Sequence, residues 1–197
     1  MELVQSLAHS CILSICCDPC LHSGEHVKDR VRPTVSERKS GKSIGADFGT
    51  WMGKRSEFVT IGKYDSSTLI YIPSMDAFYY AAPPALLSPK CNDKTVFLGQ
   101  YVVDDDLTPR VLVFDMVRIN GVSCADMPPT ERYACLQQMG DLLGPICSVQ
   151  WVGECKVLQS ELKSGRFKVP HAVRGVMALS SVPGKVTTVD EVAAKRT

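Results

Sequence analysis

The stretch VFLGQYVVDDDLTPRVLVFDMVRINGV, residues 96–122, decides the fold. Val, Phe and Tyr dominate residues 96–103 and 111–117, and such branched and aromatic side chains favour pleated, half-buried strands. Three aspartates at 104–106 and Pro109 interrupt the pattern, and Asn120-Gly121 marks a second turn. We therefore predict a β-hairpin made of strands 96–103 and 111–117.

The second strand of this hairpin is apolar almost throughout until Asp115. A strand of this kind is covered on both faces, so we predict a central place in its sheet, with Asp115 either hydrogen-bonded or functional. After Pro128-Pro129, apolar residues at helical spacing predict a helix over residues 130–143 that packs on this strand. The expected fold class is α+β, with bent antiparallel sheets and packed helices.

Four motifs follow one another in a characteristic order: Leu98-Gly99-Gln100-Tyr101, Val113-Phe114-Asp115-Met116-Val117, Asn120-Gly121 and Glu131-Arg132. Their order and spacing resemble the nucleotidyltransferase superfamily, the mRNA capping enzymes and nucleic-acid ligases, whose fold is ATP-grasp-like. Among these, the chain looks most like the snurportin cap-binding domain, which has this fold without the catalysis. The resemblance covers residues 51–143, with a fainter trace near Gly175. The closing strand of the family is not found before Thr197, so the sheet is either completed differently or shortened at the C-terminus.

The catalytic motif of these enzymes is altered in this chain. A strand beginning Lys-x-Asp-Gly-x-Arg supplies the lysine that attacks the α-phosphate in the family. With Gly53 and Arg55 aligned on that motif, Thr50 takes the place of the lysine and Met52 that of the aspartate. Snurportin keeps a Gly-Lys-Arg at the same place and has likewise lost the nucleophile.

The acidic residues of the family are also replaced. Leu98 and Gln100 stand where an Asp-Gly-Glu motif binds ribose and positions a metal, and Arg174 stands in the place of a further carboxylate. Leucine cannot coordinate magnesium, and glutamine carries no charge to hold it. The resemblance therefore implies a pseudoenzyme without metal or cofactor.

A second alignment retains a lysine. It places Lys63-Tyr64-Asp65-Ser66 on Lys-x-Asp-Gly and makes Lys63 the nucleophile of a divergent guanylyltransferase or ligase. A serine then replaces the glycine, and Thr68 falls where the arginine belongs. The interval to residues 98–100 also becomes short, so spacing argues against this alternative.

The resemblance implies a ligand site near the first motif strand. Phe48 and Trp51 are the aromatics placed to stack on a base, and Trp51 offers the larger face to a methylated, positively charged purine. Lys54 and Arg55 would meet the phosphates, and since adjacent strand residues face opposite ways, we expect Arg55 in the cleft and Lys54 in solvent. Gln100 completes the predicted ligand-binding set. The alternative for Trp51 is a core anchor.

The composition indicates a soluble globular protein. The chain has 197 residues, of which 45% are hydrophobic and 22% charged, and its formal net charge is +1. Nine scattered cysteines, an odd number without a convincing secretory signal, favour reduced thiols in an intracellular protein of the cytoplasm or nucleus. The apolar run at residues 3–17 is interrupted by polar side chains and too short to span a bilayer, so we predict an amphipathic helix and no membrane partner.

Composition divides the chain into three regions. We predict an amphipathic and basic, partly mobile segment over residues 1–45, a nucleotidyltransferase-like or cap-binding-like domain over 46–185, and a tail over 186–197. The basic stretch 28–55 can hold phosphates or dock a protein carrier, or it is a solvated linker. The N-terminal segment also gathers potential metal ligands without a second, well-separated pair, so free thiols are expected: Cys11, Cys16, Cys17, Cys20, His22 and His26.

Three functions are compatible with these observations. The first is a non-catalytic module of snurportin type that binds capped RNA or a nucleotide and acts in nuclear import. The second is a structural or assembly protein that keeps the fold without a ligand. The third is a divergent covalent nucleotidyltransferase using Lys63.

Overall fold

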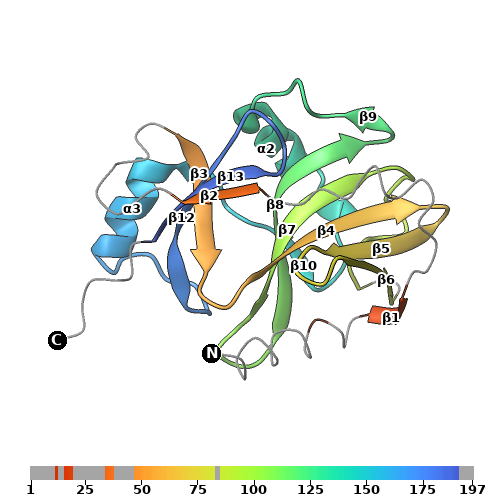
Figure 1. Cartoon of the computed structure of the whole chain (residues 1–197), viewed down its shortest axis with the longest axis horizontal. Coiled ribbons are helices and arrows are strands. Elements are labelled where there is room, and N and C mark those ends of the chain that lie inside the picture. Colours follow the sequence, from red (N-terminus) through yellow and green to blue (C-terminus); the bar gives the residue numbers. More distant parts are fainter. Residues whose placement is uncertain (1–11, 13–15, 20–33, 38–46, 83–84, 191–197) are drawn as a thin grey trace.

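A computed structural model describes residues 12, 16–19, 34–37, 47–82 and 85–190 of the chain (Figure 1). These residues form two β-sheets and a small number of helices. The helical elements are α2 (Pro129–Gln138), the 3-10 helix η2 (Gly140–Leu142) and α3 (Cys155–Lys163). The strands are β1 (Cys16–Pro19), β2 (Thr34–Glu37), β3 (Phe48–Gly53), β4 (Glu57–Tyr64), β5 (Ser67–Ile72), β6 (Ala77–Ala81), β7 (Val96–Val103), β8 (Pro109–Ile119), β9 (Val122–Ser123), β10 (Cys147–Val149), β11 (Gly153–Glu154), β12 (Val173–Leu179) and β13 (Lys185–Asp190).

Sheet A has the strand order β1-β6-β5-β4-β7-β8-β10, with β9 paired to β8. The predicted hairpin forms its centre, because β7 spans Val96–Val103 and β8 lies between β7 and β10. This confirms the central position of strand 111–117, which extends to Pro109–Ile119. Asn120 and Gly121 both have positive φ angles, 49° and 83°, as the tight turn into β9 requires.

Sheet B has the order β11-β3-β12-β13-β2. β13, which was not anticipated from the sequence, pairs antiparallel with β12. Most strand pairs are antiparallel, as predicted, but two pairs, β8 with β10 and β13 with β2, are parallel. Both involve strands of three to six residues whose partners are far away in the sequence, so no local pattern announces them.

The hydrophobic core fills two layers. One layer lies on the face of sheet A that also receives α2 and includes Ile61, Phe97, Val113 and Leu136. The other lies where the sheets meet, and there Leu98 and Phe114 of sheet A pack with Met177, Leu179 and Val186 of sheet B. Figure 1 shows α3 at the end of the molecule away from β4, β5 and β6, against β3 and β12. The class is therefore α+β, as predicted.

The helix predicted over residues 130–143 is shorter. Helix α2 ends at Gln138 and is followed by η2. Gly140 follows the cap residue Met139, and glycine loses more backbone entropy in a helix than other residues, which accounts for the break. Arg132 and Leu136 are the buried residues of α2, so the helix does pack on the sheet as expected.

The described N-terminal residues contribute to both sheets. β1 pairs with β6 of sheet A, β2 pairs with β13 of sheet B, and Ile12 is fully buried in the core. β13 also crosses the boundary placed at residue 185. The proposed division into segment, domain and tail stays a prediction, and the mobility assigned to residues 1–45 falls mainly outside the described residues. No helix among the described residues is long and apolar enough to cross a membrane.

Candidate functional site

Two of the motif positions, Thr50 on β3 and Gln100 on β7, meet in one network of neutral hydrogen bonds. Gln150, which follows β10, joins them: its Nε2 donates to Thr50 Oγ1 at 2.8 Å, and Gln100 Nε2 donates to Gln150 Oε1 at 2.7 Å. Both amides also donate to the Trp51 carbonyl, at 2.8 and 3.0 Å. The Gly53 N–H donates to Gln100 Oε1 at 3.0 Å. The network therefore joins the backbone of β3 to sheet A.

This network is closed to solvent and carries no charge. Thr50 and Gln100 are fully buried and Gln150 is 1% exposed. A buried amide whose donors and acceptor are all in use is a stable cross-link, because an unpaired polar group there would be costly. Sequence reasoning identified Thr50 and Gln100 as replacements of the family's lysine and of an acidic residue. It missed Gln150, whose role depends on contacts about 50 and 100 positions away in the chain.

Trp51 lies on the other face of β3, because successive strand residues alternate. It is 7% exposed and packs in a cluster with Cys155 and Leu158 of α3 and Val176 of β12. The ring of Phe167 lies edge-on to it at 4.9 Å between centroids. The indole is thus inside the core of this structure. Phe48, at the start of the same strand, is half-buried and lies edge-on to Tyr133 at 5.9 Å.

A chain of side-chain contacts leads outward from Trp51. Its indole Nε1 donates to His171 Nε2 at 3.3 Å, and His171 Nδ1 lies 3.1 Å from Asp104 Oδ1. Because Nε2 accepts, the proton of the neutral ring is on Nδ1 and is donated to Asp104. Arg110 makes an ion pair with the same carboxylate. Asp104 and His171 are almost fully buried, and sequence analysis did not single out this group.

Lys54 and Arg55 lie in the turn after β3, not on the strand. Both are exposed, and the strand ends at Gly53, so the argument from alternating strand faces does not apply to them. Lys54 faces solvent as expected, and the role of Arg55 in a ligand site stays a prediction. The Lys54 N–H donates to the Ala172 carbonyl at 2.8 Å, just before β12. Arg174, also exposed, is the extra residue of a β-bulge opposite Gly53 and Met52. Three cations therefore gather at this end of sheet B.

Lys63 is distant from these groups. It is half-buried near the β4–β5 turn and pairs with Thr68, whereas Gln100 pairs with Phe58 at the other end of β4. The five residue steps from Phe58 to Lys63 correspond to about 17 Å along a strand. Gln100 and Lys63 thus do not share a site in this structure.

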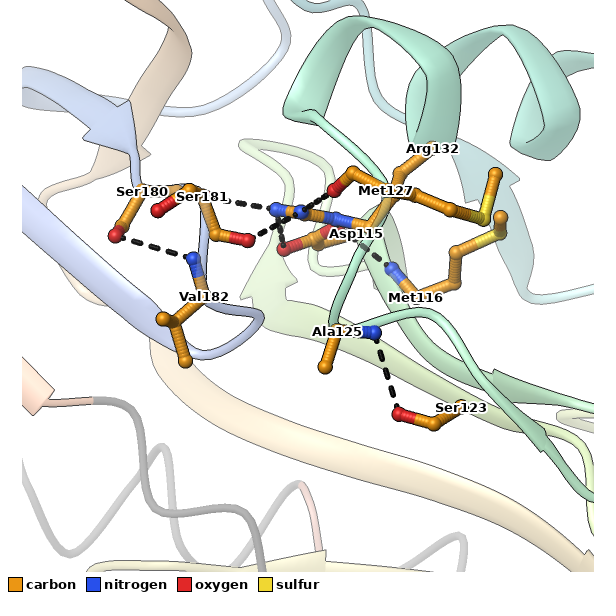
Figure 2. A network of polar contacts seen from close by, with 9 residues as sticks. All are labelled: Asp115, Met116, Ser123, Ala125, Met127, Arg132, Ser180, Ser181 and Val182. Atoms are coloured by element: carbon orange, nitrogen blue, oxygen red, sulfur yellow. Dashed lines mark hydrogen bonds and ion pairs between the residues drawn. The ribbon is translucent and has the colours of Figure 1, made fainter.

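Asp115 is held by the fully buried Arg132 of α2. Figure 2 shows the guanidinium between the carboxylate and backbone carbonyls of neighbouring segments. Its Nη1 donates to Met127 and Ser181 carbonyls, at 2.6 and 2.9 Å, and its Nη2 donates to the Ser180 carbonyl at 2.8 Å. The sequence left two alternatives for Asp115, a hydrogen-bonded or a functional carboxylate, and the structure shows it hydrogen-bonded. The ion pair with Arg132 holds α2 and the β12–β13 turn against β8.

Four of the described thiols are poor nucleophiles. Burial raises the pKa of Cys147 and of Cys155 to about 12, and raises the pKa of Cys91 and Cys124 as well. The N-terminal Cys/His cluster lies outside the described residues except for its members in β1. Within the described part of the chain, no three His, Cys, Asp or Glu side chains converge as metal ligands would.

Comparison with solved structures shows what fold this arrangement belongs to. A mycobacterial DNA ligase D complexed with ATP and MES superposes with a TM-score of 0.55 at 13% identity, covering 83% of this chain and 61% of that one. The ligase domain of M. tuberculosis LigD gives a TM-score of 0.52 at 12% identity, covering 81% and 59%. The chain thus has the nucleotidyltransferase fold of ligase domains and spans about three fifths of their length.

Comparisons of the sequence with known families and with curated proteins gave no match. The similarity to the ligase structures is therefore a similarity of fold.

Proposed function

We propose that this chain is a non-catalytic module that binds a nucleotide or capped RNA. The observation that supports the absence of catalysis is the closed network of Thr50, Gln100 and Gln150. Thr50 and Gln100 hold the motif positions that carry the attacking lysine and an acidic residue in the resembling enzymes, and neither can form a lysyl phosphoramide or hold magnesium by charge.

Nucleotide binding is supported by the fold and by the charge at one end of sheet B. A similar structure contains ATP. Lys54 and Arg55 are both exposed in the turn after β3, beside Arg174, where they can meet phosphates. A snurportin-type role, in which capped RNA is carried by this module during nuclear import, is the most specific form of the proposal.

The test is calorimetric titration of the full chain with ATP, GTP and a 7-methylguanosine cap dinucleotide, with magnesium and with EDTA. We expect saturable binding that weakens with salt and does not depend on magnesium. A double variant, Lys54→Ser and Arg55→Ser, should bind more weakly. Lys90→Ser and Lys94→Ser, which remove two charges from the β6–β7 connection, give the control of equal charge. Absence of binding by any of the three ligands would reject the proposal.

A structural or assembly role is the second candidate, and a specific observation favours it. The space between the sheets is filled by side chains, and Trp51, the predicted stacking platform, is 7% exposed. A protein that serves only as a scaffold needs no open ligand site, so a filled space between the sheets and a buried Trp51 are compatible with that role. The same titration separates the two functions, since a scaffold binds none of the nucleotides.

A further inference from the structure

The chain between α3 and the start of β12 alternates between inward and outward side chains. Along residues 166–174, every odd-numbered position is buried or half-buried and every even-numbered position is exposed. This alternation is typical of an extended chain, in which successive side chains point to opposite sides. The inward side chains are Phe167, Val169, His171 and Val173, and the outward ones are Arg166, Lys168, Pro170, Ala172 and Arg174. The outer side of this segment therefore presents three cations to solvent.

Contacts of the inward side chains fix the path of the segment. The Phe167 ring lies edge-on to the Trp51 indole at 4.9 Å between centroids, and His171 accepts the indole N–H at 3.3 Å. The Ala172 carbonyl accepts from the Lys54 N–H at 2.8 Å. The backbone beneath the outer cations is thus held by the core, and a ligand can reach these cations without any opening of the segment.

The turn after β3 extends this row of charge, because it adjoins the segment at Ala172. The cationic strip consists of the exposed side chains Lys54, Arg55, Arg166, Lys168 and Arg174. Among the residues that the structure describes, no ion pair neutralises Arg55, Arg166 or Lys168. The Arg166 Nε donates to Ser164 Oγ at 3.0 Å, which uses one of the five donors of its guanidinium. The strip therefore keeps its positive charge and most of its donors for a partner.

Acidic side chains border the cationic strip at the β7–β8 turn. The Asp105 N–H donates to the Pro170 carbonyl at 2.6 Å, so this turn lies beside the middle of the segment. Asp105 and Asp106 are both exposed, and Asp106 accepts from the Thr108 N–H at 2.9 Å. Because like charges repel, a polyanion passes on the side of the strip away from this turn.

We propose that the cationic strip is a docking surface for the phosphate backbone of single-stranded RNA. This inference rests on the proposed function, because the strip continues from Lys54 and Arg55, which would hold the phosphates of the nucleotide. Alternate residues of an extended chain are about 7 Å apart, so Arg166 and Lys168 can each meet a phosphate of their own. A single strand presents one row of phosphates to this one row of cations, whereas a mononucleotide carries its charge at one place. Such contacts position the strand without reading its sequence.

The experiment compares RNA with a mononucleotide in the double variant Arg166→Ser, Lys168→Ser. Fluorescence anisotropy measures the binding of a labelled, uncapped oligouridine of about twelve nucleotides, within the length that such surfaces cover. The loss of two phosphate contacts should lower the slope of log affinity against log salt by about 1.4, and the affinity at 0.1 M salt by roughly 10- to 30-fold. Calorimetry should show the wild-type affinity for GTP, because Lys54 and Arg55 remain.

Two further double variants serve as controls. Arg166→Lys, Lys168→Arg keeps both charges and should bind the oligouridine as the wild type does. Lys90→Ser, Lys94→Ser removes two exposed charges far from the strip, since the Lys94 N–H donates to the Lys63 carbonyl near the β4–β5 turn. It should also keep the wild-type affinity. Circular dichroism establishes that the variants fold.

The outcomes separate this inference from the proposed function. Equal RNA affinity in Arg166→Ser, Lys168→Ser and the wild type, or GTP binding without RNA binding, would overturn the strip and leave the proposed function standing. RNA binding that the double variant weakens, without binding of any nucleotide, would uphold the strip and reject the nucleotide site. A decamer of glutamate that competes as well as the oligouridine would assign the strip to an acidic protein segment instead. Absence of binding by both RNA and nucleotides would reject both proposals.

Discussion

Arg132 on α2 forms a bidentate ion pair with the carboxylate of Asp115 on β8. Its Nε donates to Oδ1 at 2.7 Å and its Nη2 donates to Oδ2 at 3.1 Å. Burial raises the pKa of the Asp115 carboxyl, and the hydrogen bonds and charge of Arg132 oppose this rise. The charged form of Asp115 in the folded protein therefore depends on Arg132.

Arg132→Met should lower the free energy of unfolding at pH 7 by about 3–5 kcal/mol, because it leaves a buried carboxylate without its partner. Urea denaturation monitored by circular dichroism measures this change. The double variant Asp115→Leu, Arg132→Met should recover most of the loss, since it removes both charges. A double variant as unstable as the single one would contradict this account.

The loss of stability in Arg132→Met should depend on pH. Without Arg132, the folded-state pKa of Asp115 rises further above its unfolded value of about 3.9. The folded state then holds the proton more tightly, so stability is highest below that value and is lost as the pH rises through the folded-state pKa. The difference in stability between Arg132→Met and the wild type should thus shrink towards acidic pH. A constant difference would exclude Asp115 as its source.

Gln100→Leu should destabilise the protein by about 1–3 kcal/mol for each partner that it leaves unpaired, foremost the buried Gly53 N–H. Gln100→Glu, which restores an acidic side chain, should also be less stable at pH 7 because it buries a charge. Gln137→Leu on the exposed side of α2 serves as the control and should be nearly neutral. Magnesium binding by Gln100→Glu would show that the network is more open than the structure indicates.

No covalent nucleotide adduct should form on this protein. After incubation with radiolabelled ATP or GTP and magnesium, we expect no label that survives denaturation, because Thr50 has no amine and Lys63 lies at the far end of β4. A ligase assayed in parallel is the positive control. Label on Lys63 in a peptide map, absent from Lys63→Ala, would establish the divergent nucleotidyltransferase instead.

Cys147 and Cys155 should resist alkylation in the folded protein at pH 8. With the pKa of each near 12, the reactive thiolate is a very small fraction of the total. Iodoacetamide labelling followed by peptide mass spectrometry measures this, and the same reaction in guanidinium chloride should label both. Rapid labelling of Cys155 without denaturant would mean that α3 detaches from β3.

Gly49→Ala should lower the free energy of unfolding by about 1–3 kcal/mol, as overpacking does. A Cβ at this position would lie 2.1 Å from the Met177 carbonyl oxygen and 2.5 Å from the Cys155 sulfur. The matched control is Gly140→Ala, where the added Cβ meets no atom within 4 Å. Thermal unfolding of the two variants provides the comparison, and equal effects would rule out the close approach of β3 to β12 and α3.

The central hairpin could be predicted from the sequence because its signals are local. Branched residues, three aspartates and Asn120-Gly121 define β7, β8 and their turns within one short stretch. β10 and β11 were not predicted as strands of these sheets, since each has only two or three residues and pairs with a distant segment. β13 was missed as well, although it forms a hairpin with the neighbouring β12. Pairing across the chain leaves no periodic pattern by which to recognise it.

The same limit applies to the candidate site. Thr50 and Gln100 were recognised as replacements of catalytic residues because each belongs to a motif that is one continuous run of residues. The burial of Trp51 was left as an alternative, because it depends on Phe167 and on His171, which lies 120 positions further along the chain. Lys54 and Arg55 were placed on a strand since no signal in the sequence shows that β3 ends at Gly53.

The parallel pair of β2 and β13 can form only late in the synthesis of the chain. Thr34 leaves the ribosome early, whereas its partner Lys185 emerges only after every other strand of both sheets. Non-local pairings of this kind are slow to form. Until β13 is made, the edge of β12 that it covers has open hydrogen-bonding groups. Sheet B is thus completed after translation of residues 185–190, and a nascent chain stalled before that point has an edge available to chaperones or to aggregation.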